Sequence, residues 1–345
     1  MKVLLAPLNW GLGHASRCVP LVQRLLDEGH EVVLGGDGES LTLLRKHFPK
    51  LRYVYLAPLN LRYSKGQRQV WAILKALPRL IAWVIKDHIL LKALLREEHF
   101  DQIISDNRFG LYLNRPTTNE ALTGPTTIYI THQLHIMLPK GWKLAEPLAS
   151  YLHARIYTHF DKVWIPDYED REQSLAGDLS HPRQFKIQNS KFKINYLGPL
   201  SRFSLSTVNY QLSTVNYDTI AVLSGLEPHR TLLEQELVSR FADKEEKVLI
   251  VQGLPNKPNT RIKRGNITIV PYLNDDELAS ALLGAKHIIA RSGYSTIMDL
   301  HALGLLKKSN HQSSIINHQL ELLPTPGQPE QEYLATWIAQ KALFL

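Results

Sequence analysis

Short runs rich in valine, isoleucine and leucine alternate along this chain with longer stretches in which apolar residues recur every three or four positions. The short runs are typical of buried strands and the longer stretches of amphipathic helices. In the first half we predict a helix over about 14–28 and strands at Lys2–Ala6, Glu31–Leu34, Gln102–Ser105, Thr127–Ile130 and Lys162–Ile165. This alternation predicts a parallel β-sheet covered by helices.

The same alternation restarts at residue 218. It predicts helices near His229–Phe241, near Asp275–Leu283 and after Gly293, and strands at Asp218–Leu223, Lys247–Val251, Ile267–Val270 and Lys286–Ala290. A chain of 345 residues exceeds what one hydrophobic core usually organises. We therefore predict an α/β protein with two doubly wound, Rossmann-like domains, residues 1–200 and 218–345.

Two segments interrupt this pattern. Residues 201–217 are the predicted linker, and a seven-residue unit that begins at Ser206 is repeated from Ser213, a period far too short for a solenoid. Residues 307–321 are polar with weak periodicity, and we predict an inserted loop where the rhythm requires a strand. The amphipathic pattern is still running at Leu345 without a glycine or proline stop, so we expect a truncated C-terminal domain.

Composition narrows the class of protein. Hydrophobic residues make up 44% of the chain and charged residues 21%, as in ordinary globular proteins. The most apolar window, Val70–Leu95, contains five charged residues, so we predict no transmembrane helix. The single cysteine, Cys18, forms no internal disulfide, which favours a cytoplasmic location.

The net charge of +8 lies entirely in the first part of the chain. Residues 1–200 carry 26 Lys and Arg against 18 Asp and Glu, residues 201–345 carry 14 against 14, and residues 51–100 carry 9 against 3. Such a region attracts the phosphates of nucleic acid or of an anionic membrane, although a solvated helix face has the same composition. Nucleic acid is the least favoured partner, because few stacking aromatic residues are interleaved with the basic ones.

The turn between the first strand and the first helix contains Gly11, Gly13 and His14. Glycines there permit a tight turn that leaves helix amides facing an anion, although the spacing is not a dinucleotide fingerprint. With an ordinary pKa of about 6.5, His14 suits a general base at the carboxyl end of a strand; the alternative is a capping or packing histidine. Asp106 is a candidate carboxylate partner for His14, or a helix cap. Further polar residues follow predicted strands at 105–108, at 131–133 and at 167.

Three turns in the second half of the chain contain residues suited to bind phosphate, ribose or sugar hydroxyls. Ser224 and Gly225 follow a strand, and Arg230 comes in the first turn of the next helix, which makes a plausible diphosphate cradle. The second turn is 291–296, where Ser292 and Gly293 would hold a phosphate and Asp299, on the following helix, a ribose. The third, 324–332, combines prolines and a glycine with Gln and Glu side chains that suit sugar hydroxyls, or is simply a proline-rich turn before a polar helix.

With these motifs in this order, the chain resembles the GT-B glycosyltransferases, and among them family 28, which includes the enzyme that adds N-acetylglucosamine to the lipid-linked peptidoglycan precursor. The resemblance rests on the Gly-x-Gly-His turn at 11–14, the Arg-Ser-Gly-x-x-Thr turn at 291–296 and the Thr-Pro-Gly-Gln-x-Glu-Gln segment at 325–331. It spans nearly the whole chain. It implies an acceptor site in the N-terminal domain, a nucleotide-sugar donor site in the C-terminal domain and a reaction between them.

The resemblance also implies roles for single residues. His14, with Asp106 beside it, would act on the acceptor hydroxyl, and Gly11 and Gly13 would form the acceptor-side turn. Tyr272 and Leu273 would read the base with their backbone. Together with the motifs above, the expected donor-binding residues are Ser224, Gly225, Arg230, Tyr272, Leu273, Arg291, Ser292, Gly293, Thr296, Asp299, Gln328, Glu330 and Gln331.

The implied reaction is transfer of a hexosyl or N-acetylhexosaminyl group from a nucleotide-sugar, usually a UDP-sugar, with inversion and without a metal or cofactor. No Asp-x-Asp triad or His/Cys cluster with metal-ligand spacing occurs in the sequence. Trp71, Trp83 and the basic residues of 61–96 would dock the protein peripherally on the inner face of an anionic membrane, which points to a lipid or lipid-linked acceptor.

Two alternatives remain open. The insertion at 307–321 and the early end would fit an inactive or binding-only homologue. The nucleotide-sugar 2-epimerases share the two-domain fold, but the charged set that they need is not apparent in the sequence.

Overall fold

A computed structural model describes residues 1–59, 69–113, 124–182, 193–205, 217–306 and 318–341. The chain forms two compact units whose main boundary lies between Leu200 and Ser201. Most of the linker that we predict, residues 206–216, lies outside the described residues, as do residues 307–317 of the predicted loop. None of the helices in the described part of the chain combines the length and the hydropathy that spanning a bilayer requires.

The described residues of the first unit build a seven-stranded sheet with the order β3-β2-β1-β4-β5-β6-β7, parallel throughout. Its strands are β1 (Lys2–Pro7), β2 (Glu31–Gly36), β3 (Tyr53–Tyr55), β4 (Gln102–Asp106), β5 (Thr126–Ile130), β6 (Lys162–Ile165) and β7 (Lys193–Tyr196). The chain direction across the sheet reverses between β1 and β4, which pair from Val3 with Gln102 to Pro7 with Asp106. In sheets of this kind ligands bind beyond the carboxyl ends of the strands at such a reversal.

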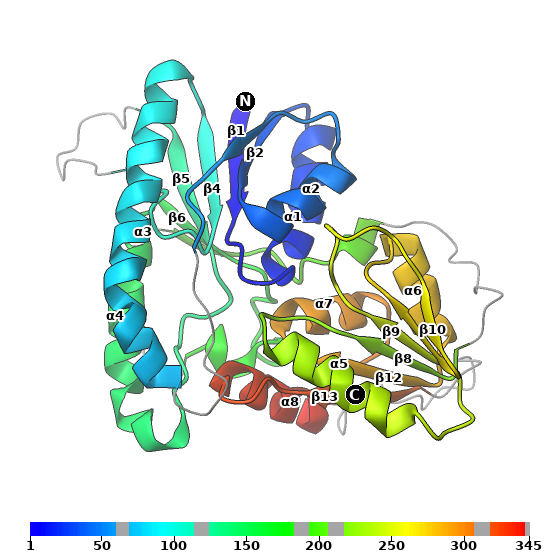
Figure 1. Cartoon of the computed structure of the whole chain (residues 1–345). Coiled ribbons are helices and arrows are strands. Elements are labelled where there is room, and N and C mark those ends of the chain that lie inside the picture. Colours follow the sequence, from blue (N-terminus) through cyan, green and yellow to red (C-terminus); the bar gives the residue numbers. More distant parts are fainter. Residues whose placement is uncertain (60–68, 114–123, 183–192, 206–216, 307–317, 342–345) are drawn as a thin grey trace. The chain divides into compact units, whose positions relative to one another are not determined.

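Helices cover both faces of this sheet. Helices α1 (Gly13–Asp27) and α2 (Gly38–His47) lie on one face, and α3 (Gln69–Glu97) and α4 (Glu146–Tyr157) lie on the other (Figure 1). Apolar side chains of β1, β2 and β4 pack with Leu91 of α3, and those of β5 and β6 pack with Tyr157 of α4. Gly110 permits the close approach of α3, because a Cβ atom there would lie 2.4 Å from the carbonyl oxygen of Val84.

In the second unit the described residues form a six-stranded sheet with the order β10-β11-β9-β8-β12-β13. Its strands are β8 (Thr219–Val222), β9 (Val248–Val251), β10 (Ile262–Arg264), β11 (Ile267–Val270), β12 (His287–Arg291) and β13 (Gln319–Leu323). The pairs are parallel except for β10 with β11, which are antiparallel. The helices are α5 (His229–Phe241), α6 (Asp275–Gly284), α7 (Tyr294–Ala302) and α8 (Pro329–Lys341), and α5 packs on the apolar face of β8, β9 and β11.

Short 3₁₀ helices lie between some of these elements. The 3₁₀ helices are Lys140–Ala145, Gly177–Leu179 and Arg202–Leu205.

The inserted loop that we predict over residues 307–321 is too long at its C-terminal end. Residues 319–321 belong to β13, because Gln319–Leu323 pair in register with His287–Arg291 of β12. A strand therefore leads directly into the Pro324–Gln328 turn.

Candidate functional site

The turn between β1 and α1 brings His14 to the carboxyl edge of the first sheet. Gly11 has φ of 77°, a left-handed conformation in which glycine is unstrained, and α1 begins two residues later at Gly13. His14 therefore lies in the first turn of α1, beside the end of β4, because β1 and β4 are neighbours in the sheet. The predicted acceptor-side turn thus has the strand-turn-helix geometry that its glycines indicate.

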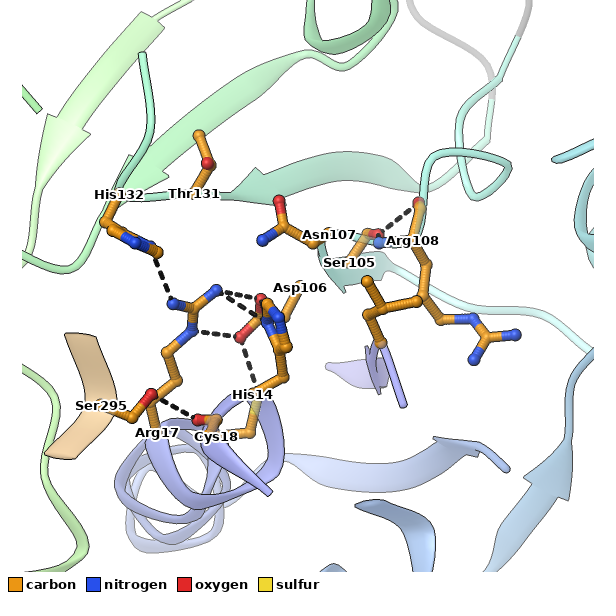
Figure 2. Close-up of polar contacts among 12 residues, drawn as sticks. His14, Arg17, Cys18, Ser105, Asp106, Asn107, Arg108, Thr131, His132 and Ser295 are labelled. Carbon is orange, nitrogen blue, oxygen red and sulfur yellow. Dashed lines mark hydrogen bonds and ion pairs between the residues drawn. The ribbon is translucent and has the colours of Figure 1, made fainter. Parts of the chain in front are cut away.

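His14, Arg17 and Asp106 form one hydrogen-bonded cluster (Figure 2). Nδ1 of His14 lies 2.8 Å from Oδ1 of Asp106, as the sequence predicted for a carboxylate partner. Arg17 donates from Nε to Oδ2 of Asp106 at 2.6 Å, and its Nη2 also donates to Oδ1. His14 and Arg17 share a face of α1 because three residues separate them, and Cys18 Sγ is 3.6 Å from Oδ2 of the same carboxylate.

Burial and charge set the protonation states of this cluster. Asp106 and Arg17 are 1% and 2% exposed, and His14 is half-buried. Burial by itself would raise the pKa of Asp106, but the Arg17 guanidinium holds that pKa well below its usual value. Burial lowers the pKa of His14, the nearby Asp106 carboxylate partly opposes this, and the Arg17 guanidinium lowers it further. At neutral pH the imidazole is therefore neutral and able to accept a proton.

Two more groups surround this cluster. Nη1 of Arg17 lies 3.1 Å from Nδ1 of His132, which follows β5. Asn107, directly after β4, has φ of 57°, and its Oδ1 accepts a hydrogen bond of 2.6 Å from the hydroxyl of Tyr129. The polar segments predicted at 105–108 and 131–133 thus meet beyond neighbouring strands. Asp167 serves a loop instead, since it accepts from the hydroxyls of Ser174 and Ser180.

A second buried arginine, Arg108, follows Asp106 by two positions after β4. It donates to Asp87 on α3 and to Asp37, which precedes α2, and it is fully buried. Asn9, at the end of β1, donates to Asp37 at 3.0 Å. Sequence reasoning placed His132 and Arg108 only within the polar segments that follow strands, and it gave no role to Arg17, Asp37 or Asp87. For Arg17 the sequence holds one signal, its spacing from His14, because residues three apart share a helix face.

In the second unit, parallel pairing brings the predicted donor residues to one edge of the sheet. Ser224 and Gly225 follow β8, Tyr272 and Leu273 follow β11, and 291–293 join β12 to α7. Gly225 is exposed with φ of 94°, whereas Leu273 is buried. Burial raises the pKa of Tyr272 to about 12, so its phenol is neutral at physiological pH.

Both predicted phosphate-binding arginines are engaged within the unit. Arg291 donates to the carbonyl oxygens of Pro324 at 3.0 Å and of His229 at 3.2 Å. These bonds connect the end of β12 to the residue after β13 and to the start of α5. Arg230 forms ion pairs with Glu227 and Glu234. The hydroxyl of Ser292 donates to the carbonyl oxygen of Gln331 at 2.8 Å.

Asp299, the predicted ribose-binding carboxylate, is buried on α7. Its Oδ1 accepts a hydrogen bond of 2.7 Å from Ser201, and its Oδ2 lies 3.5 Å from Nε of Arg202. Burial raises the pKa of Asp299 to about 6, although Arg202 and Ser201 favour the ionised form. Arg202 also faces Asp275 at 3.1 Å. A carboxylate offers about four acceptor positions, so Asp299 retains acceptor capacity beyond the contacts to Ser201 and Arg202.

The Pro-Gly-Gln segment forms a hydrogen-bonded turn before α8. Nε2 of Gln331 donates to Oε1 of Gln328 at 2.5 Å, and the backbone N–H of Thr325 donates to Oε1 of Gln331 at 2.8 Å. Glu330 lies in the first turn of α8, and Thr296 lies in the first turn of α7. Among the described residues no group of three or more His, Cys, Asp or Glu side chains is placed to hold a metal ion.

Comparisons with known proteins agree with this architecture. The two doubly wound units have the GT-B fold of glycosyltransferases. The structure of the glycotransferase of kitacinnamycin matches with a TM-score of 0.55 at 13% identity, over 97% of this chain and 84% of that one. Phytolacca americana UGT2, complexed with UDP-2fluoro-glucose and pterostilbene, matches with a TM-score of 0.53 at 14% identity, over 98% of this chain and 83% of that one.

The sequence relatives point the same way. A protein of Methanosarcina acetivorans described as an uncharacterized glycosyltransferase is 23% identical over 315 residues, which cover 88% of this chain and 78% of that protein. No protein-family model matches the chain. The GT-B fold predicted from the sequence is confirmed.

Proposed function

We propose that this protein is a glycosyltransferase that moves a hexosyl or N-acetylhexosaminyl group from a nucleotide-sugar, most simply a UDP-sugar, to an acceptor hydroxyl. The observation that carries the proposal is the pair of His14, in the first turn of α1, and Asp106, at the end of β4. The sequence relatives described as glycosyltransferases and the UDP-sugar in the Phytolacca americana complex support it. The resemblance of the motifs to family 28 supports the same reaction class.

In the proposed reaction, Nε2 of His14 takes the proton of the acceptor hydroxyl as its oxygen forms a bond to the anomeric carbon of the donor. The bond from that carbon to the diphosphate oxygen breaks, and the nucleoside diphosphate leaves with the electron pair. Asp106 accepts a hydrogen bond from the Nδ1–H of His14 and, while it stays ionised, stabilises the imidazolium that forms. A single displacement of this kind inverts the anomeric centre, and we propose that it needs no metal.

For the donor, we propose the edge of the second sheet. Backbone amides at the start of α7 would face the diphosphate, because a helix N-terminus favours negative charge. Asp299 would accept hydrogen bonds from the ribose hydroxyls, and Gln328, Glu330 and Gln331 would face the sugar. Arg291 acts here by holding the β12, β13 and α5 ends together, since its guanidinium donates to Pro324 and His229.

A binding titration tests the donor site. UDP, UDP-N-acetylglucosamine, UDP-glucose and GDP-mannose are titrated into the protein, into Asp299→Ala and into Asp276→Ala, an exposed carboxylate of the same unit that serves as the control. We expect micromolar binding of one UDP-sugar, weakened by about 1–3 kcal/mol in Asp299→Ala and unchanged in Asp276→Ala. Absence of binding to all four ligands would refute the proposal and leave a binding-inactive homologue.

We further propose that the first unit docks on an anionic membrane and that the acceptor is a lipid or a lipid-linked molecule. Leu77, Ile81, Ile85 and Ile89 of α3 are 44–59% exposed and recur every four residues, which makes one apolar stripe. Exposed cations flank it on the same helix: Lys75, Arg79, Lys86, Lys92 and Arg96. An apolar face bordered by lysine and arginine is typical of helices that bind anionic lipid surfaces.

One residue assigned to this face from the sequence is placed elsewhere. Trp83 is buried and donates from its indole N–H to the carbonyl oxygen of Ala57 at 2.8 Å, so it holds α3 to the body of the unit. Lys65 and Arg68 lie outside the described residues, and nothing is described of the side chain of Trp71.

Vesicle flotation tests the membrane proposal. We expect salt-sensitive binding to vesicles that contain phosphatidylglycerol and none to pure phosphatidylcholine vesicles. Ile85→Glu should abolish the binding, whereas Leu232→Glu should leave it unchanged, because Leu232 is a similarly exposed apolar residue on α5. Equal flotation of the two variants would contradict the assignment of α3.

A further inference from the structure

Nδ1 of His14 lies close to both a hydrogen-bond acceptor and a hydrogen-bond donor. It is 2.8 Å from Oδ1 of Asp106, which accepts hydrogen bonds, and 3.0 Å from Nη2 of Arg17, which donates them. A neutral imidazole carries its proton on one nitrogen. If Nδ1 donates to Asp106, Nε2 has a lone pair and can act as a base. If Nδ1 instead accepts from Arg17, the proton is on Nε2 and the base is lost.

Arg17 itself decides between these arrangements. Its Nε and Nη2 engage Oδ2 and Oδ1 of Asp106 in a bidentate fork, which fixes the plane of the carboxylate relative to α1. Each carboxylate oxygen has two lone pairs, so Oδ1 can accept from Nη2 of Arg17 and from Nδ1 of His14 together. The 3.0 Å approach of Arg17 to His14 then follows from two donors that converge on one oxygen.

The same guanidinium favours the other tautomer in His132, with the proton on Nε2. Nη1 of Arg17 lies 3.1 Å from Nδ1 of His132. Arginine has no acceptor, so this nitrogen of His132 must accept, and the proton of its neutral ring lies on Nε2. The Arg17 guanidinium therefore lies close to Nδ1 of both histidines. It leaves the proton of His14 on Nδ1 and the proton of His132 on Nε2.

We propose that Arg17 is a positioning residue that holds Asp106 ionised and oriented, so that His14 keeps its proton on Nδ1 and His132 keeps its proton on Nε2. The inference rests on the proposed function only in calling His14 a base. The cluster balances in charge, because the arginine and the carboxylate neutralise each other in a buried setting where an unpaired carboxylate would take up a proton. The arginine does not touch the reacting atoms and acts through the carboxylate.

Nuclear magnetic resonance of the full chain with ¹⁵N-labelled histidine tests the arrangement without any enzymatic assay. The ring signals of His14 and His132 are assigned by their loss in His14→Gln and His132→Gln. At pH 7.5 we expect the proton of His14 on Nδ1 and the proton of His132 on Nε2. A neutral His14 with its proton on Nε2, or the same tautomer in both rings, would overturn the proposal.

Variants at position 17 separate positioning from mere packing. Arg17→Lys keeps a cation beside Asp106, whereas Arg17→Met keeps the bulk and removes the charge. We expect the His14 ring to titrate at higher pH in Arg17→Met, because the cation that opposes its protonation is gone while Asp106 stays beside the ring, and to titrate close to the wild-type pH in Arg17→Lys. Identical titration in the wild type and in Arg17→Met would overturn the proposal.

The enzymatic readout distinguishes failure of the two proposals. The acid limb of the kcat/KM profile should move with the His14 titration in Arg17→Met and stay in place in Arg17→Lys. UDP-sugar affinity, which we propose to reside in the second unit, should be the same in the wild type and in both variants. If the ring tautomers and titrations are as expected but no transfer occurs with any donor and acceptor, the positioning role stands and the proposed function fails.

Discussion

Replacement of Arg108 by methionine tests what holds the first unit together. The Arg108 guanidinium donates to both oxygens of Asp87 at 2.9 and 2.8 Å, to Asp37 at 2.8 Å and to the carbonyl oxygen of Ala57 at 2.6 Å. It joins α3, the start of α2 and the segment after β3 to the end of β4. Arg108→Met keeps a long side chain in this buried position but leaves two carboxylates without their cation.

Two estimates of the cost agree. Removing one partner of a buried ion pair typically costs about 3–5 kcal/mol. If one carboxyl instead takes up a proton at pH 7 against an ordinary pKa of about 3.9, the cost is about 4 kcal/mol. Burial already raises the pKa of Asp87 with Arg108 present, so Asp87 is the group that we expect to protonate. The folded variant then binds one proton more than its unfolded chain, and its penalty should shrink by roughly 2–3 kcal/mol between pH 7 and pH 5.

Urea unfolding at pH 7 and pH 5, combined with amide hydrogen exchange, measures both numbers. Exchange of β1 and β4 reports on the first unit, and exchange of β8 and β12 serves as an internal control. Arg96→Met, at the exposed end of α3, should change the free energy of unfolding by less than about 0.5 kcal/mol. Adding Asp87→Asn to Arg108→Met should recover much of the loss at pH 7. A cost of Arg108→Met below about 1 kcal/mol at pH 7, or an equal cost at both pH values, would refute the reasoning.

Three further predictions concern the proposed reaction. Asp106→Asn should lower kcat by roughly 10²- to 10⁴-fold with unchanged donor affinity, because His14 loses its anionic partner; steady-state kinetics check this, and a change within about threefold would contradict it. UDP-sugar affinity should fall as pH drops through about 6, where Asp299 takes up a proton and no longer accepts from ribose at both oxygens; calorimetry from pH 5 to pH 8 checks this, with Asp299→Asn expected to give a flat profile. The transfer rate should be the same before and after EDTA treatment, and a rate restored only by added Mg²⁺ would disprove metal independence.

The fold was predictable wherever a strand is a short apolar run or a helix has one apolar side. The strands Lys162–Ile165 and Ile267–Val270 and the helix His229–Phe241 have the predicted bounds. Helix α3 was not identified as a helix, because leucine and isoleucine occur on its exposed side as well as on its packed side, which blurs the 3.6-residue period. The short strand β3 is likewise too brief to give a pattern.

The candidate site residues were predictable only where they lie at the carboxyl ends of predicted strands. His14 and Asp106 could be paired because parallel strands end at one edge of a sheet, and the structure brings them together. Nothing in the sequence marks Arg17 and Arg108 as buried. Their burial depends on carboxylates 89 and 71 residues away, Asp106 and Asp37. Such a pairing arises from tertiary packing, and no local pattern announces it.

The outer edge of the second sheet bears on how the protein behaves in concentrated solution. The edge strand β10 is short, fully exposed and contains Lys263 and Arg264. An open strand edge presents unpaired N–H and C=O groups on which a second chain can add. Two molecules that met through β10 would set cations against cations, which opposes fibre-like stacking. Added salt screens this repulsion, so the colloidal stability of the protein should be greatest at low ionic strength.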